Sequence, residues 1–138
     1  MSYRHLEHST DAVIEVTAPT LINAFEIAGM SVVETILNSS KIDEKDSRIV
    51  SVTGKDLIYL LYNWLEEIII LTITDGFAAR KISVKIDKNH EYRIQAQIFG
   101  EDIDIKKHGF KIEIKSPTFH EMYIQEGEQI TLRYLLDL

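Results

Sequence analysis

The spacing of the apolar residues constrains this chain most, because it changes from a helical period to a strand period along the sequence. Two segments carry apolar residues at steps of three and four, which is typical of helices with one buried face. The first begins near Pro19 and ends at Asn38–Ser40, and the second begins after Gly54 and ends at Thr74–Gly76. Proline suits the first helical position, since the N–H that it lacks would be unpaired there.

Much of the remaining sequence alternates between apolar and polar residues, as half-buried strands do. Residues 82–86 and 92–98 are clear examples, and the short polar link between them is typical of a hairpin. Five further segments share this alternation: residues 13–16, 48–52, 110–114, 118–125 and 129–137. One apolar and one polar face predict a sheet that is covered on one side. The sequence therefore predicts an α+β fold, a two-layer sandwich with two helices packed on one face of a mainly antiparallel sheet of about six to seven strands.

Length and composition exclude several classes of protein. The 138 residues suit a single domain, residues 1–138, and the net charge of −7 argues against strong direct binding to nucleic acid. Since cysteine is absent, the chain has no disulfide, no thiolate zinc site and no Cys nucleophile. The N-terminus lacks the apolar region of a signal peptide, and the longest apolar runs are too short for a bilayer. We therefore expect a cytoplasmic protein that contacts no membrane.

Acidic and histidine residues concentrate just before the first expected strand. His5, Glu7, His8 and Asp11 lie in one short segment, where they are candidates to ligate a metal or to position a proton donor. The alternative is a turn capped by Asp11 or Ser9, with both histidines at the surface.

The C-terminus supplies a second candidate site. Asp137 directly precedes Leu138, so that a side-chain carboxylate lies next to the terminal α-carboxylate. If the chain ends inside a strand, these like charges repel unless a cation lies between them. Ca²⁺ and Mg²⁺ prefer such all-oxygen ligands, whereas a frayed and solvated terminus is the alternative.

Histidines and glycines add no convincing catalytic set. In the last hairpin, Asp137 should lie opposite about position 117, which puts His120 three residues along the neighbouring strand as either a ligand or a core residue. His108 falls in an expected loop, where a surface position explains it equally well. The sequence contains no P-loop, no dinucleotide fingerprint and no G-x-S-x-G motif.

Several motifs resemble, in order, those of the archease family. Leu6–Asp11 resembles the family's opening L-(E/D)-H-T-A-D, and Asp56–Leu65 is similar to its helix D-L-x-x-L-L-x-x-W/F-L. Gly100–Glu101 and Lys107–His108 match its G-E…K-H stretch. The chain also stops as the family does, on Asp137 followed by one aliphatic residue.

The resemblance implies a non-catalytic cofactor of the RtcB-type tRNA-splicing RNA ligase, which promotes guanylylation of the ligase and restores its turnover. Carried over residue by residue, the family's metal site falls on Asp11, Asp137 and the terminal carboxylate of Leu138. These oxygen ligands suit a divalent cation, with Ca²⁺ favoured and Mg²⁺ or Mn²⁺ as alternatives. Four further residues would orient the ligands or contact the partner: His8, Glu101, His108 and His120.

Two other functions stay open on the sequence alone. Some members of the family are linked to a tRNA cytosine methyltransferase, so the second hypothesis is a chaperone-like modulator of an RNA-processing enzyme with a structural metal. The third is a metal-dependent hydrolase that uses His8, His120 and the aspartates. No nucleophile or acid–base pair stands out to support it, so we expect a binding protein and not an enzyme.

Overall fold

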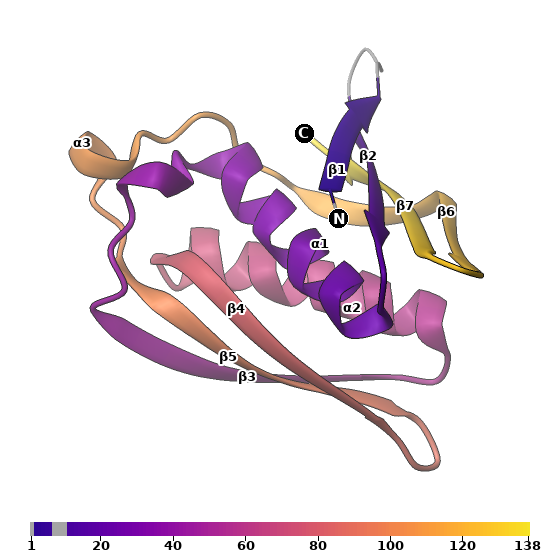
Figure 1. Cartoon of the computed structure of the whole chain (residues 1–138). Coiled ribbons are helices and arrows are strands. Elements are labelled where there is room, and N and C mark those ends of the chain that lie inside the picture. The colour runs from indigo at the N-terminus through magenta and orange to yellow at the C-terminus, as the bar shows by residue number, and fades with distance from the viewer. Residues whose placement is uncertain (1, 7–10) are drawn as a thin grey trace.

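The structure, a computed structural model, describes residues 2–6 and 11–138 (Figure 1). Within these residues the strands are β1 (Ser2–Leu6), β2 (Asp11–Ala18), β3 (Asp46–Gly54), β4 (Phe77–Lys88), β5 (Tyr92–Asp102), β6 (Ser116–Glu126) and β7 (Ile130–Asp137). The helical segments are α1 (Leu21–Ile36), the 3₁₀ turn η1 (Ser39–Lys41), α2 (Leu57–Ile69), the π-helical turn η2 (Ile70–Thr74) and α3 (Ile105–His108).

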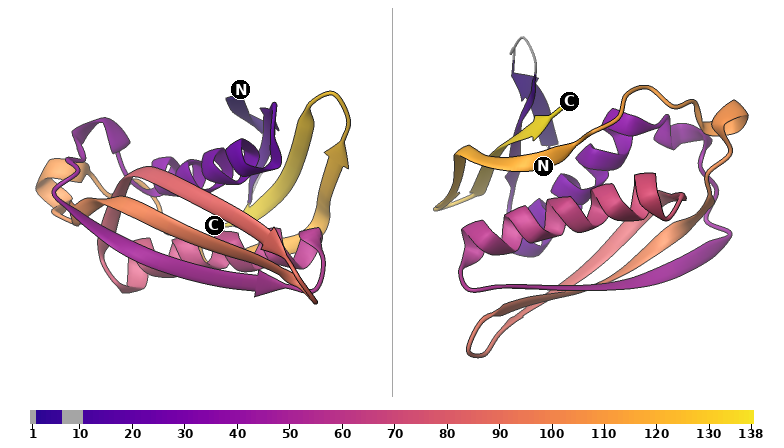
Figure 2. Two further views of the ribbon diagram at one scale, coloured as in Figure 1. Left: turned by 60° about the horizontal axis from the view of Figure 1, so that its bottom comes forward. Right: turned by 180° about the vertical axis from the view of Figure 1, so that it is seen from behind.

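The strands form two antiparallel sheets, and the two long helices lie between them (Figure 2). One sheet has the strand order β1-β2-β7-β6 and the other has the order β3-β5-β4. Helix α1 contacts β4 on one side and β2 on the other, whereas α2 contacts β3 and β6. Both helices are therefore covered on two sides by strands.

Side-chain caps begin both long helices. The hydroxyl oxygen of Thr20 accepts a hydrogen bond from the Asn23 backbone N–H at 3.1 Å, and Asp56 Oδ1 accepts one from the Tyr59 N–H at 2.9 Å. These bonds satisfy N–H groups that have no partner inside the helix. Because Thr20 is the cap, Pro19 precedes the helix and does not occupy its first turn as the sequence predicts.

Buried hydrogen bonds join the helices to each other and to the larger sheet. Trp64 Nε1 of α2 donates to the Phe25 carbonyl of α1 at 2.8 Å. The Ser31 hydroxyl donates to the Ala28 carbonyl at 2.6 Å, so the Tyr134 hydroxyl of β7 is the donor in its 2.5 Å bond to Ser31 Oγ. Burial raises the pKa of Tyr134, which keeps that donor protonated. Each bond offsets the cost of removing a polar group from water.

The α+β class is confirmed, but the strands form two sheets and not the single sheet that their alternation predicts. One cluster of buried apolar side chains includes residues of both sheets and both helices. Alternation of apolar and polar residues indicates that one face of a strand is buried. It does not indicate which element covers that face. The same pattern therefore fits a two-layer and a three-layer arrangement.

Two segments differ from the elements that the sequence predicts. Residues 110–114 are not a strand, because Phe110 forms only an isolated bridge with Leu37 and the next residues run without a strand partner to β6. Conversely, Ser2–Leu6 pairs with β2 as an edge strand, although its charged residues are typical of a loop. An edge strand tolerates such residues, since only one of its sides is paired.

The helical segment Leu57–Thr74 reaches the length and mean hydropathy (1.4) of a membrane span. It is also the core helix of this fold, because Trp64, Leu65 and Ile68 are fully buried between the two sheets. Contacts with the protein's own strands thus account for its apolar character.

A glycine permits the close approach of β4 and β5. The register of this pair shifts at a bulge between Ala79 and Lys81, and Gly100 lies across from it. A Cβ atom at Gly100 would overlap the carbonyl oxygen of Ala78 and lie 3.0 Å from the Cα of Ala79. Since the obstacle is backbone, a side chain cannot be accommodated without moving the strands.

We expect Gly100→Ala to lower the free energy of unfolding by at least about 2 kcal/mol, because the added methyl group displaces the neighbouring strand. Urea denaturation followed by circular dichroism measures this change. The matched control is Gly127→Ala in the β6–β7 turn, where the nearest atom to the new Cβ lies at 3.8 Å. That control should change stability by less than about 0.5 kcal/mol. Equal stability of the two variants would contradict the account of the bulge.

Candidate functional site

The structure brings together the two aspartates at opposite ends of the chain. Asp11 begins β2, Asp137 ends β7, and the two are direct partners in the antiparallel register. Directly opposite residues project from the same face of a sheet, with Cβ atoms about 4.5–5.5 Å apart. Leu138 follows immediately, is half-buried and packs against the core. We call Asp11, Asp137 and the carboxylate of Leu138 the terminal carboxylate site.

Strand alternation determines the direction in which these carboxylates point. Ala12 and Leu136, their neighbours in sequence, belong to the buried core, so Asp11 and Asp137 project from the outer face of the four-stranded sheet. The next pair on this outer face is Val13 and Leu135, which are only 5% and 2% exposed. Buried apolar neighbours lower the local dielectric and strengthen the attraction between carboxylates and a cation.

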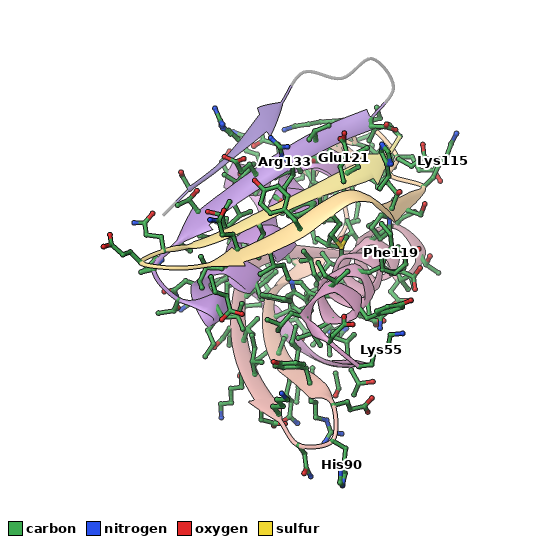
Figure 3. All side chains as sticks on the ribbon, turned by 90° about the vertical axis from the view of Figure 1, so that its right-hand side faces the viewer. Lys55, His90, Lys115, Phe119, Glu121 and Arg133 are labelled. Atoms are coloured by element: carbon green, nitrogen blue, oxygen red, sulfur yellow. The ribbon has the colours of Figure 1, made fainter. Side chains whose placement is uncertain are left out.

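Ion pairs occupy the outer face beyond this apolar pair. Glu15 contacts Arg4 of β1 at 3.2 Å and Arg133 of β7 at 3.6 Å. Arg133 also lies over the ring of Tyr123, with 5.5 Å between the guanidinium carbon and the ring centroid (Figure 3). Glu15 therefore has two arginine partners on this face of the sheet.

The donor set of the terminal carboxylate site fits a hard divalent cation. Two aspartate side chains and one α-carboxylate offer only oxygen atoms, which Ca²⁺, Mg²⁺ and Mn²⁺ accept. No group of three or more His, Cys, Asp or Glu side chains that could hold a metal occurs among residues 2–6 and 11–138. Within this part of the chain the terminal carboxylate site therefore offers two side-chain carboxylates, and the α-carboxylate of Leu138 is the next carboxylate along the chain. Like charges directly across two strands destabilise the pair, so a cation between them would stabilise it.

Lys115 is a neighbour of this site that the sequence does not single out. Its backbone N–H donates to the carbonyl oxygen of Asp137 at 2.7 Å, and the next residue, Ser116, lies opposite Asp137 in the β6–β7 pair. The side chain of Lys115 is exposed at this end of the sheet (Figure 3). From the sequence, the register of the last hairpin is the feature that could have shown that Lys115 lies beside Asp137.

Of the two remaining histidine candidates, His120 lies apart from the terminal carboxylate site. His8 lies outside the described residues. The side chain of His120 is 73% exposed, and its Nε2 lies 4.0 Å from Glu121 Oε1. Its backbone N–H donates to Thr118 Oγ1 at 3.0 Å. His120 is therefore a surface residue and not the core histidine that the spacing left open.

A wide bulge in β6 explains the position of His120. Between the pairs formed by Thr118 and Tyr123, residues 119–122 lie opposite a single residue of β7. Within the bulge Glu121 has φ 58°, the one positive value at a non-glycine position in the described chain. Phe119 leaves the sheet and stacks on Tyr62 of α2, with 4.1 Å between ring centroids and an 8° angle between planes (Figure 3). Such a stacked pair contributes about 0.5–1.5 kcal/mol, which offsets part of the backbone strain of about 1–3 kcal/mol at Glu121.

Glu101 and His108 form a separate buried cluster. Glu101 Oε2 accepts hydrogen bonds from the Asp43 backbone N–H at 2.8 Å, Lys107 Nζ at 2.8 Å and His108 Nε2 at 2.9 Å. His108 Nδ1 accepts from the Asp104 backbone N–H at 3.0 Å, so the ring proton is on Nε2 and is donated to Glu101. We call these residues the Glu101–His108 lock, because they join α3 to the end of β5 and to the segment before β3.

The lock lies apart from the terminal carboxylate site. In the right-hand view of Figure 2, α3 lies at one edge of the molecule and the C-terminus lies away from it. Glu101 is 8% exposed and His108 is fully buried, so both side chains are turned mainly toward each other and their neighbours in the lock. Their assignment as residues that orient the metal ligands or contact a partner stays a prediction. The two residues position α3 and the segment that follows it.

Comparison with known proteins identifies relatives over nearly the whole chain. The model of the archease protein family matches residues 3–138. A protein named "Protein archease" from Pyrococcus abyssi is 37% identical over 90% of this chain and 88% of its own length. The protein of the same name from Pyrobaculum neutrophilum is 37% identical over 99% of this chain and 95% of its own length. The solution structure of protein 1598 from Methanobacterium thermoautotrophicum matches with a TM-score of 0.83 at 31% identity, covering 99% of both chains.

The lock predicts how stability depends on pH. Hydrogen bonds from Asp43, Lys107 and His108 lower the pKa of Glu101 from 4.5 to about 2. A carboxyl with a lower pKa in the folded state stabilises the protein above its unfolded pKa, and this contribution is lost as the pH falls toward the folded value. We therefore expect the melting temperature to fall between about pH 5 and pH 2, and to fall less steeply in Glu101→Gln.

Thermal unfolding followed by circular dichroism at several pH values measures both profiles. Glu91→Gln, which alters an exposed glutamate of the β4–β5 hairpin, is the matched control and should follow the wild-type profile. If Glu101→Gln kept the wild-type slope between about pH 5 and pH 2, the lock would not be the source of the acid sensitivity.

Proposed function

This chain belongs to the archease family, and on that premise we propose that it is a non-catalytic activator of the RtcB-type tRNA-splicing RNA ligase. Family membership is consistent with a cofactor role in RNA processing. In the proposal, the protein promotes guanylylation and turnover of the ligase through its terminal carboxylate site. The observation that carries this assignment is the β2–β7 register, which sets Asp11 opposite Asp137.

The proposed activity requires ligands held in a fixed position. Nucleotidyl transfer from GTP depends mainly on positioning and on neutralising the charge of the phosphates. Asp11, Asp137 and the carboxylate of Leu138 would hold the divalent cation, with Ca²⁺ favoured, and the bound cation supplies that charge neutralisation. Because Asp11 and Asp137 belong to paired strands, their backbone is already ordered before a partner arrives.

The charge of the whole protein supports the same partner. A net charge of −7 attracts the protein toward a basic surface, such as the RNA-binding face of a ligase. The buried histidine of the described chain, His108, uses both ring nitrogens in the lock and is not available as a base. Both features favour an accessory protein over an enzyme.

A second candidate is a chaperone-like modulator of a tRNA cytosine methyltransferase, in which the metal is purely structural. The observation that favours it is that the terminal carboxylate site joins the first residue of β2 to the last residue of β7. A cation held there would fasten the two central strands of the four-stranded sheet. Loss of a ligand would then lower stability before it lowers any activity.

We expect Asp11→Asn and Asp137→Asn each to reduce the stimulation of the ligase at least tenfold, because each removes one anionic oxygen ligand. The assay is multiple-turnover RNA ligation by the cognate ligase with GTP and Mn²⁺, with this protein in substoichiometric amount. Asp87→Asn changes an exposed aspartate in the β4–β5 hairpin and should leave the stimulation unchanged.

Thermal unfolding of the same variants, with and without Ca²⁺, separates the two candidates. The activator proposal predicts lost stimulation with a melting temperature without Ca²⁺ that is not lower than that of wild type, since each variant removes one of two like charges across the strands. A lower melting temperature combined with full stimulation would support the structural metal instead. Full stimulation and an unchanged Ca²⁺ affinity in Asp137→Asn would contradict both candidates.

A further inference from the structure

The segment from α3 to the start of β6 exposes several apolar side chains to solvent. We call residues 105–115 the basic–apolar strap. Ile105, Phe110 and Ile112 are 65%, 43% and 40% exposed. Single apolar residues at a surface are ordinary, but three along one short connection are a pattern found at interaction sites. Figure 1 shows this segment running from α3 past the end of α1 to the start of β6.

The strap is also positive in an acidic protein. It carries four lysines and one glutamate, whereas the chain as a whole has a net charge of −7. Lys107 is used by the lock, and Lys111 Nζ donates to the Glu34 carbonyl at 3.0 Å. Within the described part of the chain, the ammonium groups of Lys106 and Lys115 have neither an ion pair nor a hydrogen bond. Two cations are therefore free to meet an acidic surface.

Backbone hydrogen bonds hold the strap in place although it contains no strand. The Asn38 N–H donates to the His108 carbonyl at 2.8 Å, and the Lys111 N–H donates to the Ile36 carbonyl at 2.7 Å. At the far end, the Lys115 N–H donates to the Asp137 carbonyl at 2.7 Å. The exposed side chains are thus presented from an ordered backbone, which lowers the entropy cost of binding.

We propose that the basic–apolar strap is the docking surface for the ligase, and that it fits an apolar pocket edged by acidic side chains on that enzyme. This inference rests on the proposed function. The positive charge of the strap complements such a pocket, and burial of the strap's apolar side chains would drive the association. Because Lys115 is bonded to Asp137, docking of the strap also fixes where the terminal carboxylate site meets the ligase.

A protein surface accounts for the strap better than an RNA does. Phosphates are recognised by clustered cations, and only two lysines of the strap are free in a protein of net charge −7. Phe110 is the strap's one aromatic face for stacking, whereas Ile105 and Ile112 offer neither such a face nor a hydrogen bond to a base. Aliphatic side chains are instead typical of the core of a protein interface.

The test compares binding of the purified ligase to variants of this protein by isothermal titration calorimetry. We expect the triple variant Ile105→Ser, Phe110→Ser and Ile112→Ser to bind at least tenfold more weakly, with its Ca²⁺ binding and melting temperature unchanged. Lys106→Glu should also weaken binding and reduce its dependence on salt. The matched control is Ile49→Ser on β3, because Ile49 is 74% exposed and lies outside the strap.

The outcomes separate this inference from the proposed function. If the triple variant bound the ligase as tightly as wild type while Asp137→Asn lost its stimulation, the docking surface would be wrong and the activator role would stand. If the triple variant lost affinity for a tRNA half but not for the ligase, the strap would be an RNA contact and the inference would be overturned. If wild type neither bound nor stimulated the ligase, both proposals would fail together.

Discussion

The pairing of β2 with β7 is the constraint on which the rest of the structure depends. It joins strands from opposite ends of the chain over the registers from Asp11–Asp137 to Ala18–Ile130. Closing so long a loop costs conformational entropy, which the buried inner face of the pair offsets through its contacts with α1 and its place in the shared core. The same register determines the outer face, where it leaves two carboxylates side by side. Folding and the candidate site thus depend on one set of backbone hydrogen bonds.

Elements whose causes are local could be predicted from the sequence. The helix that Asp56 caps and the two hairpins follow from residues close together in the chain, and the structure contains all three. The number of sheets could not be predicted, because alternation does not identify what covers the apolar face. For the same reason, the apolar alternation of residues 110–114 wrongly predicted a strand. Ile114 is buried, but Ile112 is 40% exposed on a segment without a strand partner.

The candidate site was predicted by resemblance and not by spacing alone. Asp11 and Asp137 are 126 positions apart, so no local pattern could show that they lie opposite each other. Glu101 and His108 also came from the resemblance, and the sequence did not show that they form a buried hydrogen-bonded cluster. Their role toward a partner stays a prediction. The position of His120 depended on a bulge that hairpin counting does not detect. Long-range register and backbone irregularity therefore limit what such reasoning can find.

The central claim is that the β2–β7 register creates a cation site from Asp11, Asp137 and the terminal carboxylate. The most direct measurement is NMR of the protein with ¹³C-labelled carboxyl groups of aspartate and leucine during titration with Ca²⁺. The account predicts saturable chemical-shift changes at Asp11, Asp137 and the carboxylate of Leu138, with Asp87 and Asp102 unaffected. Equal, non-saturating changes at all aspartates, or none at the terminal carboxylate site, would contradict it.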